Sequence, residues 1–166
     1  MPILPRNAFE FFSHSPEQTR RVGIRLGTLL QPGQVVCLEG DLGSGKTTLV
    51  QGAAQGWGST DHVSSPTYVI VNDYQRADGH HLYHADAYRL DAENPLDTAI
   101  LDLDRILVEG ILVVEWADRI RSALPADSLW VSMSWINPEQ RHLVFTPHGK
   151  DYETLTRKLE EALYGA

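Results

Sequence analysis

The sequence is poor in cysteine and in lysine. Its only cysteine, Cys37, has no second thiol in the chain for a disulfide and lies in an apolar run. We therefore expect a buried, inert thiol and a reducing compartment. Only three residues are lysines, and the formal net charge is −8. A chain without a broad basic face is poorly suited to neutralise nucleic-acid phosphates, which argues against independent binding to DNA or RNA.

Long hydrophobic runs are also missing. No segment approaches the roughly 18 apolar residues that a membrane span needs, and residues 1–14 lack an apolar stretch of signal-peptide length. We expect a cytoplasmic protein without a membrane partner. The hydrophobic fraction of 42% and the charged fraction of 22% are typical of globular chains. With 166 residues and no Gly/Ser-rich linker, we expect one domain over 1–166.

The spacing of apolar residues predicts alternating helices and strands. Residues 15–30 open with Ser15 as a cap and Pro16 in the first helical position, which predicts a helix. The other expected helices cover 46–58, 91–107 and 151–164. Strands are expected at 9–12, 35–39 and 111–118, with antiparallel hairpins formed by 64–75 with 81–90 and by 128–136 with 140–147. This order indicates a three-layer α/β domain with a mostly parallel central sheet and antiparallel hairpins at its edge.

The decapeptide GDLGSGKTTL, residues 40–49, fits the phosphate-binding pattern GxxxxGK[ST]. It stands between a predicted strand and a predicted helix, as the pattern requires, and so makes the expected fold P-loop NTPase-like. Glycines allow the backbone N–H groups to turn inward around an anion, where a Cβ would obstruct them. The helix that follows directs its positive end at the same anion. The alternative is a glycine-rich turn that merely joins a strand to a helix.

Within this motif, Lys46 is expected to reach the β and γ phosphates of a nucleotide, and the Thr47 hydroxyl to coordinate Mg²⁺. Thr48 could contact the ligand or serve in helix packing. The predicted nucleotide-binding residues are Asp41, Leu42, Gly43, Ser44, Gly45, Lys46, Thr47 and Thr48.

A phosphate-binding loop does not make an ATPase, because hydrolysis also needs an acidic group near the metal and a group that positions water. Glu115 follows the apolar run ILVV, at the carboxyl end of a predicted strand, where doubly wound sheets gather their ligand residues. We interpret it as a water-positioning or metal-shell group, against the alternative of a solvated strand-end carboxylate. Trp116 could pack on the nucleotide or a partner, or could be an ordinary core or rim residue.

The segment HLYHADAYR supplies a second carboxylate, Asp86, which we predict to lie in the magnesium shell. His80 and His84 would share its face on an extended strand, so a transition-metal site is conceivable, although their spacing is not diagnostic. We favour hydrogen bonds within the sheet for His84. The loop SSPTY could be a simple turn, but its place after the phosphate-loop helix favours a nucleotide-switch role for Thr67.

Four motifs in this order, GDLGSGKTTL, SSPTYVIVNDY, LYHADAYRL and VVEWADRI, resemble those of the bacterial TsaE (YjeE) family over roughly residues 9–146. The resemblance implies a small P-loop α/β ATPase, weakly active alone, that works in tRNA threonylcarbamoyladenosine biosynthesis. It implies binding to the complex of TsaD with TsaB, which ATP hydrolysis resets between turnovers. Transfer RNA would be met indirectly, through that complex.

Carried over by position, the resemblance implies that Gly43, Gly45, Lys46, Thr47 and Thr48 contact ATP. It implies that Thr47, Asp86 and Glu115 serve Mg²⁺, that Lys46, Asp86 and Glu115 serve hydrolysis, and that Trp116 lies beside the nucleotide. It also implies a mobile switch at Ser65 to Thr67.

Two other functions remain open from the sequence alone. A P-loop kinase of a small metabolite would carry an arginine-bearing lid, and the arginines here are scattered. A nucleotide-gated binding module, in which Glu115 only holds a switch, would not hydrolyse ATP. A GTPase is disfavoured because the chain has no N-K-x-D guanine-reading motif.

Overall fold

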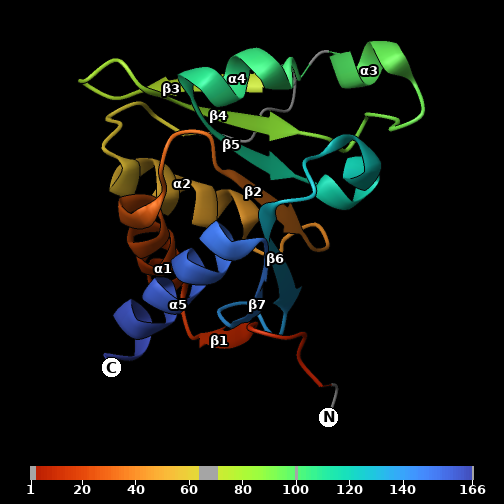
Figure 1. Cartoon of the computed structure of the whole chain (residues 1–166). Helices are drawn as coiled ribbons and strands as arrows, with labels where there is room; N and C mark the ends of the chain where they lie inside the picture. The colour runs from red at the N-terminus through yellow and green to blue at the C-terminus, as the bar shows by residue number, and fades with distance from the viewer. Residues whose placement is uncertain (1–2, 64–70, 100, 166) are drawn as a thin grey trace.

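One mixed β-sheet forms the centre of the molecule in a computed structural model, which describes residues 3–63, 71–99 and 101–165 (Figure 1). The described residues form a seven-stranded sheet in the order β1-β7-β6-β2-β5-β4-β3. Its strands are β1 (Phe9–Ser13), β2 (Val35–Glu39), β3 (Val71–Gln75), β4 (His81–Asp86), β5 (Gly110–Glu115), β6 (Ser128–Trp135) and β7 (Arg141–His148).

Parallel pairing is confined to the middle of this sheet. Strands β6, β2, β5 and β4 run parallel to one another, whereas β7 and β1 at one edge and β3 at the other add antiparallel pairs. The predicted fold class is therefore confirmed, including both hairpins over the described residues. Since these strands are parallel, the carboxyl ends of β2, β4 and β5 lie together on the same side of the sheet.

Helices cover both faces of the sheet and make the three predicted layers. They are α1 (Pro16–Leu29), α2 (Lys46–Trp57), α3 (Pro95–Ala99), α4 (Leu103–Glu109), the 3-10 helix η1 (Ala117–Ala123) and α5 (Lys150–Tyr164). On β2, Val36 and Leu38 face the core beneath α1, α2 and α5, while Val35 and Cys37 face the core beneath α4 and η1. This alternation follows from the period of two in a strand and explains why the whole run is apolar.

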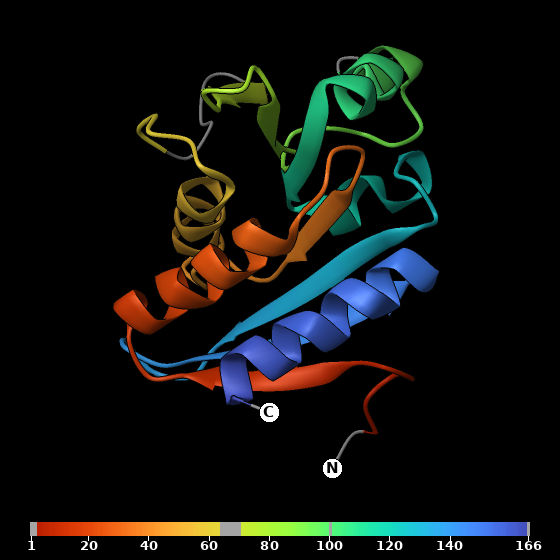
Figure 2. The same cartoon turned by 60° about the vertical axis from the view of Figure 1, so that its left-hand side comes forward.

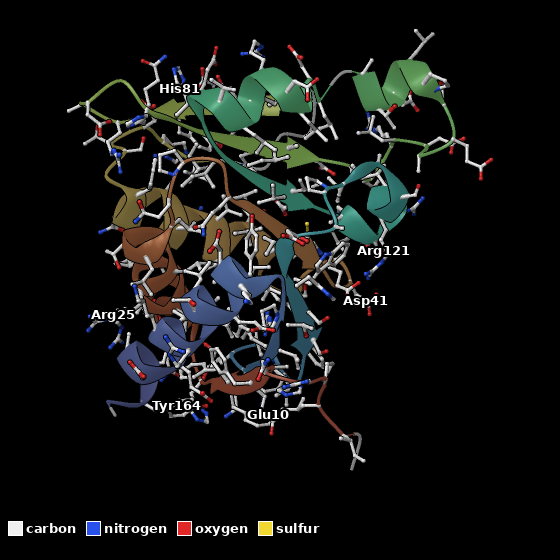
Figure 3. The ribbon with its side chains drawn as sticks, viewed as in Figure 1. Glu10, Arg25, Asp41, His81, Arg121 and Tyr164 are labelled. Carbon is white, nitrogen blue, oxygen red and sulfur yellow. The ribbon has the colours of Figure 1, made fainter. Side chains whose placement is uncertain are left out.

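Helices α1 and α5 lie along the same side of the sheet, as Figure 2 shows. The predicted cap of α1 is confirmed, because the Ser15 side chain accepts a hydrogen bond from the Gln18 amide at 3.1 Å. At the far end of α5, the Tyr164 hydroxyl donates to the carbonyl oxygen of Glu10 at 2.7 Å (Figure 3). The C-terminal helix is thereby tied to the edge strand β1.

Backbone meets backbone where α1 crosses α2. A Cβ added to Gly23 would lie 2.3 Å from the Leu49 carbonyl oxygen, and one added to Gly27 would lie 2.1 Å from that of Ala53. Gly52 and Gly56 of α2 approach the carbonyl oxygens of α1 just as closely. Glycine at these positions therefore sets how close α2, which begins with Lys46, can come to α1.

Several predicted elements differ from those in the structure. The helix expected over 91–107 is wrong as one element, because α3 and α4 are separate helices. Asp102, at the N-cap of α4, has a φ of 44°, which no helix interior allows. The strand expected over 111–118 ends at Glu115, because Trp116 has a φ of 58° and η1 begins at Ala117.

Strand β4 likewise ends at Asp86, before the predicted end at residue 90. None of the helices in the described ranges is both long and apolar enough to cross a membrane.

Candidate functional site

The loop of residues 40–45 joins the end of β2 to the start of α2. Two of its glycines have a left-handed backbone conformation. Gly43 and Gly45 have φ values of 79° and 97°, in a region that side chains with a Cβ rarely enter. At Gly40 an added Cβ would lie 2.3 Å from the Met133 carbonyl oxygen, so the loop packs directly on β6. Figure 3 shows Asp41 of this loop at the same end of the molecule as Arg121 of η1.

Lys46 folds back over this loop. Its ammonium donates to the carbonyl oxygens of Gly40 and Asp41 at 2.5 and 3.0 Å and to the Ser44 hydroxyl at 3.3 Å. It also lies 4.1 Å from the centre of the Trp116 ring. Burial lowers the pKa of Lys46, and the nearby charge of Glu115 is the largest opposing influence. Within the described residues, no carboxylate forms an ion pair with this ammonium.

Glu115 brings β5 into contact with the first turn of α2. The residue is 4% exposed. Its carboxylate accepts from the Thr47 hydroxyl, with Oγ1 lying 3.2 Å from Oε1 and 3.4 Å from Oε2. Its Oε2 also accepts a short hydrogen bond from Nε2 of His84. The alternative of a solvated strand-end carboxylate is therefore wrong.

His84 is fully buried between two strands of the sheet. Its Nδ1 lies 3.1 Å from the Tyr74 hydroxyl on β3, and its Nε2 contacts Glu115 on β5. The prediction that it bonds within the sheet is confirmed. His80 does not join it, because its imidazole bonds to Arg76 and Asp78 in the β3–β4 turn. No group of three His, Cys, Asp or Glu in the described ranges could hold a metal, so the conceived transition-metal site is wrong there.

Asp86 ends β4 directly beside Glu115, its partner in the parallel pairing of β4 with β5. Its Oδ1 accepts from the Tyr88 amide at 2.9 Å, which fixes the turn after the strand. The structure thus gathers Lys46, Thr47, Glu115 and Trp116 through direct contacts and adds Asp86 by strand register.

Other predicted residues occupy different positions around the loop. Leu42 is 89% exposed at its tip, and Thr48 is half-buried in α2. A cavity of about 480 Å³ opens beside the loop and is lined in part by Asp41, Trp116 and Trp135. The switch expected at Ser65 to Thr67 lies outside the described residues.

Sequence reasoning missed two neighbours of the site. It did not connect His84 with Glu115, although the two-residue spacing from His84 to Asp86 places both on one face of β4. It also missed Arg141, the first residue of β7, whose Nε lies 3.8 Å from a Cβ position built on Gly45. Nothing in the local sequence around Arg141 indicates that the β6–β7 hairpin reaches the loop.

The strand, glycine loop and helix, with a carboxylate on the neighbouring strand, define an α/β protein of the P-loop NTPase type. The family model for "Threonylcarbamoyl adenosine biosynthesis protein TsaE" matches residues 13–143. The chain belongs to the TsaE family, which confirms the resemblance seen in its motifs.

Relatives of this family match most of the chain. The tRNA threonylcarbamoyladenosine biosynthesis protein TsaE of Bacillus subtilis is 38% identical, over 87% of this chain and 89% of its own length. The protein of the same name from Streptomyces coelicolor is 39% identical, over 81% of this chain and 94% of its own. The crystal structure of Bacillus subtilis YdiB superposes with a TM-score of 0.79 at 31% identity, covering 98% of this chain and 99% of that one.

Proposed function

We propose that this protein is an ATPase that uses ATP and Mg²⁺ in tRNA threonylcarbamoyladenosine biosynthesis, the pathway of its family. The observation that supports hydrolysis best is the contact of Glu115 with Thr47, one residue after Lys46. It places a buried carboxylate beside the hydroxyl that the loop motif assigns to the metal.

The loop suits a polyphosphate. The Lys46 ammonium bonds to uncharged oxygen atoms, so its charge has no carboxylate partner among the described ion pairs. The N-cap of α2 is Gly45, and no side chain caps this helix end. The first amides of a helix without a cap, with the positive end of its dipole, bind phosphate readily.

The oxygen atoms around Thr47 suit Mg²⁺. This ion prefers oxygen ligands, and in nucleotide sites it is held by one or two carboxylates together with the phosphates and water. Thr47, Asp86 and Glu115 would supply those groups, and the described residues form no cage of three or more acidic or histidine ligands. When bound, ATP supplies the phosphoanhydride bond and Mg²⁺ neutralises its developing charge.

This chain's own residues have separate tasks in the proposed reaction. Lys46 would bind phosphate oxygens in place of the loop carbonyls, and the Trp116 ring lies against its ammonium. Glu115 accepts a hydrogen bond from the attacking water and orients it. Its burial beside His84 keeps the carboxylate in one place.

We further propose TsaD and TsaB as the protein partners, with a hydrolysis step that is slow in the isolated chain and faster in their complex. Hydrolysis would reset that complex between turnovers. The formal net charge of −8 agrees with tRNA being held by the partners and not by this chain.

The test is phosphate release from ATP, measured with and without purified TsaB and TsaD. We expect turnover that the partners stimulate and that Lys46→Ala nearly abolishes. A phosphorylated product formed only with a hydroxyl acceptor would instead show a kinase. Negligible turnover in the complete mixture, with tight nucleotide binding, would show a binding module and overturn the ATPase proposal.

A further inference from the structure

A chain of polar side chains connects Glu115 to the two strands beyond β5. Asn72 Nδ2 donates to the Tyr74 hydroxyl at 3.3 Å, and this hydroxyl lies 3.1 Å from His84 Nδ1. His84 Nε2 in turn contacts Oε2 of Glu115. Tyr74 is 4% exposed and His84 is fully buried, so the connection runs through the interior of the sheet.

The direction of these hydrogen bonds follows from the acceptor at one end. An ionised carboxylate only accepts, so Nε2 of His84 must carry the proton that bonds to Glu115. In a neutral imidazole the other nitrogen, Nδ1, is then an acceptor. The Tyr74 hydroxyl, whose oxygen already accepts from Asn72, supplies the donor. In this arrangement, the Asn72 amide, the Tyr74 hydroxyl and the His84 imidazole each donate in the direction of Glu115.

We propose that His84 is a positioning residue for Glu115, and that Tyr74, through its contact with Nδ1, holds the His84 ring in the orientation that donates to the carboxylate. This inference rests on the proposed function, in which Glu115 orients water. With Oε2 held by His84, Oε1 is the oxygen left for a water, once the Thr47 hydroxyl serves the metal instead. Hydrogen-bond donors that contact the second oxygen of a functional carboxylate, and so fix its orientation, are common at such sites.

Packing alone does not explain these residues. A buried polar group must be hydrogen-bonded or it destabilises the fold, so an apolar residue would be the simpler filler at this point of the sheet. The main chain of His84 pairs with Val113, but its side chain reaches two residues further, to Glu115. The interaction thus serves the carboxylate and not the strand pairing.

Kinetics of the full chain with TsaB and TsaD test this proposal. The variants are His84→Leu, His84→Gln and Tyr74→Phe, with Tyr83→Phe as the matched control. Tyr83 is adjacent to His84 on β4, but its hydroxyl donates to Glu109, away from the site. Each variant is measured for kcat, for the Kd of a non-hydrolysable ATP analogue with Mg²⁺, and for thermal unfolding.

We expect His84→Leu to lower kcat by about 10–100-fold while the nucleotide Kd stays unchanged. His84→Gln, whose amide can still donate to Glu115, should recover most of the lost rate. Tyr74→Phe should give a smaller loss than His84→Leu, and Tyr83→Phe should give none. Unchanged kcat in a folded His84→Leu variant, or a loss seen in Kd instead of kcat, would overturn the positioning role.

A spectroscopic readout separates this inference from the proposed function. Imidazole ¹⁵N NMR of the native chain should show the Nε2–H tautomer of His84, and Glu115→Ala, which removes the acceptor at Nε2, should allow the Nδ1–H form to appear. An Nδ1–H form in the native chain would overturn the inference whether or not ATP is hydrolysed. If the native protein shows the Nε2–H form but no partner-stimulated hydrolysis, the proposed function fails and the catalytic part of the inference fails with it.

Discussion

The ring of Trp116 lies against the ammonium of Lys46, with Nζ 4.1 Å from the ring centre. Trp116 reaches this place through a left-handed backbone conformation, with a φ of 58°, directly after Glu115. Such a conformation is costly for a bulky residue and persists only where its surroundings hold it. The turn thus lets two consecutive residues contact the first turn of α2, Glu115 at Thr47 and Trp116 at Lys46.

This contact predicts a fluorescence change on nucleotide binding. A phosphate that draws the ammonium away from the indole changes the charge at the ring, so the emission of Trp116 should shift when ATP and Mg²⁺ are added. Trp116→Phe should remove the shift. Trp57→Phe should keep it, because Trp57 stacks on Arg76 at the other end of α2. A shift that survives in Trp116→Phe would contradict the prediction.

Substitutions of Glu115 and Lys46 should affect ATP hydrolysis and ATP binding differently. Glu115→Ala is expected to lose phosphate release almost completely but to keep most of its affinity for ATP, because the carboxylate acts on water and metal. Lys46→Ala should lose both, because its ammonium is the cation that the loop provides. Isothermal titration calorimetry with phosphate-release kinetics measures the two effects. Full activity in Glu115→Ala would remove this residue from its proposed role.

Helix packing predicts a stability effect at Gly27. A Cβ there would lie 2.1 Å from the Ala53 carbonyl oxygen, so Gly27→Ala should force α1 and α2 apart and lower the free energy of unfolding by about 1–3 kcal/mol. Thr28→Ala, at the exposed neighbouring position, should change it by less than about 0.5 kcal/mol. Urea unfolding compares the two variants. Equal stability of Gly27→Ala and the native chain would show that the helices can yield.

Cys37 should be inert in the folded chain. Burial raises the pKa of its thiol to about 12, so the reactive thiolate is scarce near neutral pH. A thiol reagent at pH 8 should label the native protein far more slowly than the urea-unfolded protein. Because the unfolded thiol ionises at lower pH than the folded one, its contribution to stability should decline as the pH rises above about 9. Rapid labelling of the native protein would contradict the burial of this side chain.

Much of the fold was predictable because the apolar patterns are local and strong. The run at β2 and the cap at Ser15 gave both the types and the limits of their elements. The prediction of one helix over 91–107 was wrong because the chain turns at Asp102 in a left-handed conformation. This conformation usually indicates glycine, and no glycine in the sequence marks the turn. The predicted end of β5 was wrong for the same reason, because Trp116 is also left-handed without being glycine.

The residues of the site were predictable where a local sequence pattern identifies them. Lys46 and Thr47 follow from the loop pattern, and Glu115 from its place at a strand end. The contact of Thr47 with Glu115 spans 68 positions of the chain, and that of His84 with Glu115 spans 31. Such contacts depend on strand order, which periodicity does not reveal.

The glycine contacts between α1 and α2 couple the loop of residues 40–45 to a distant edge of the sheet. Glycines of each helix contact carbonyl oxygens of the other, so no side chains between α1 and α2 can rearrange to let one helix slide past the other. The two helices therefore move as one unit. At its own start α1 is tied to β1, where the hydroxyls of Ser13 and Thr19 lie 2.7 Å apart. A displacement of the first turn of α2 would therefore move α1 and, through it, the N-terminal strand β1.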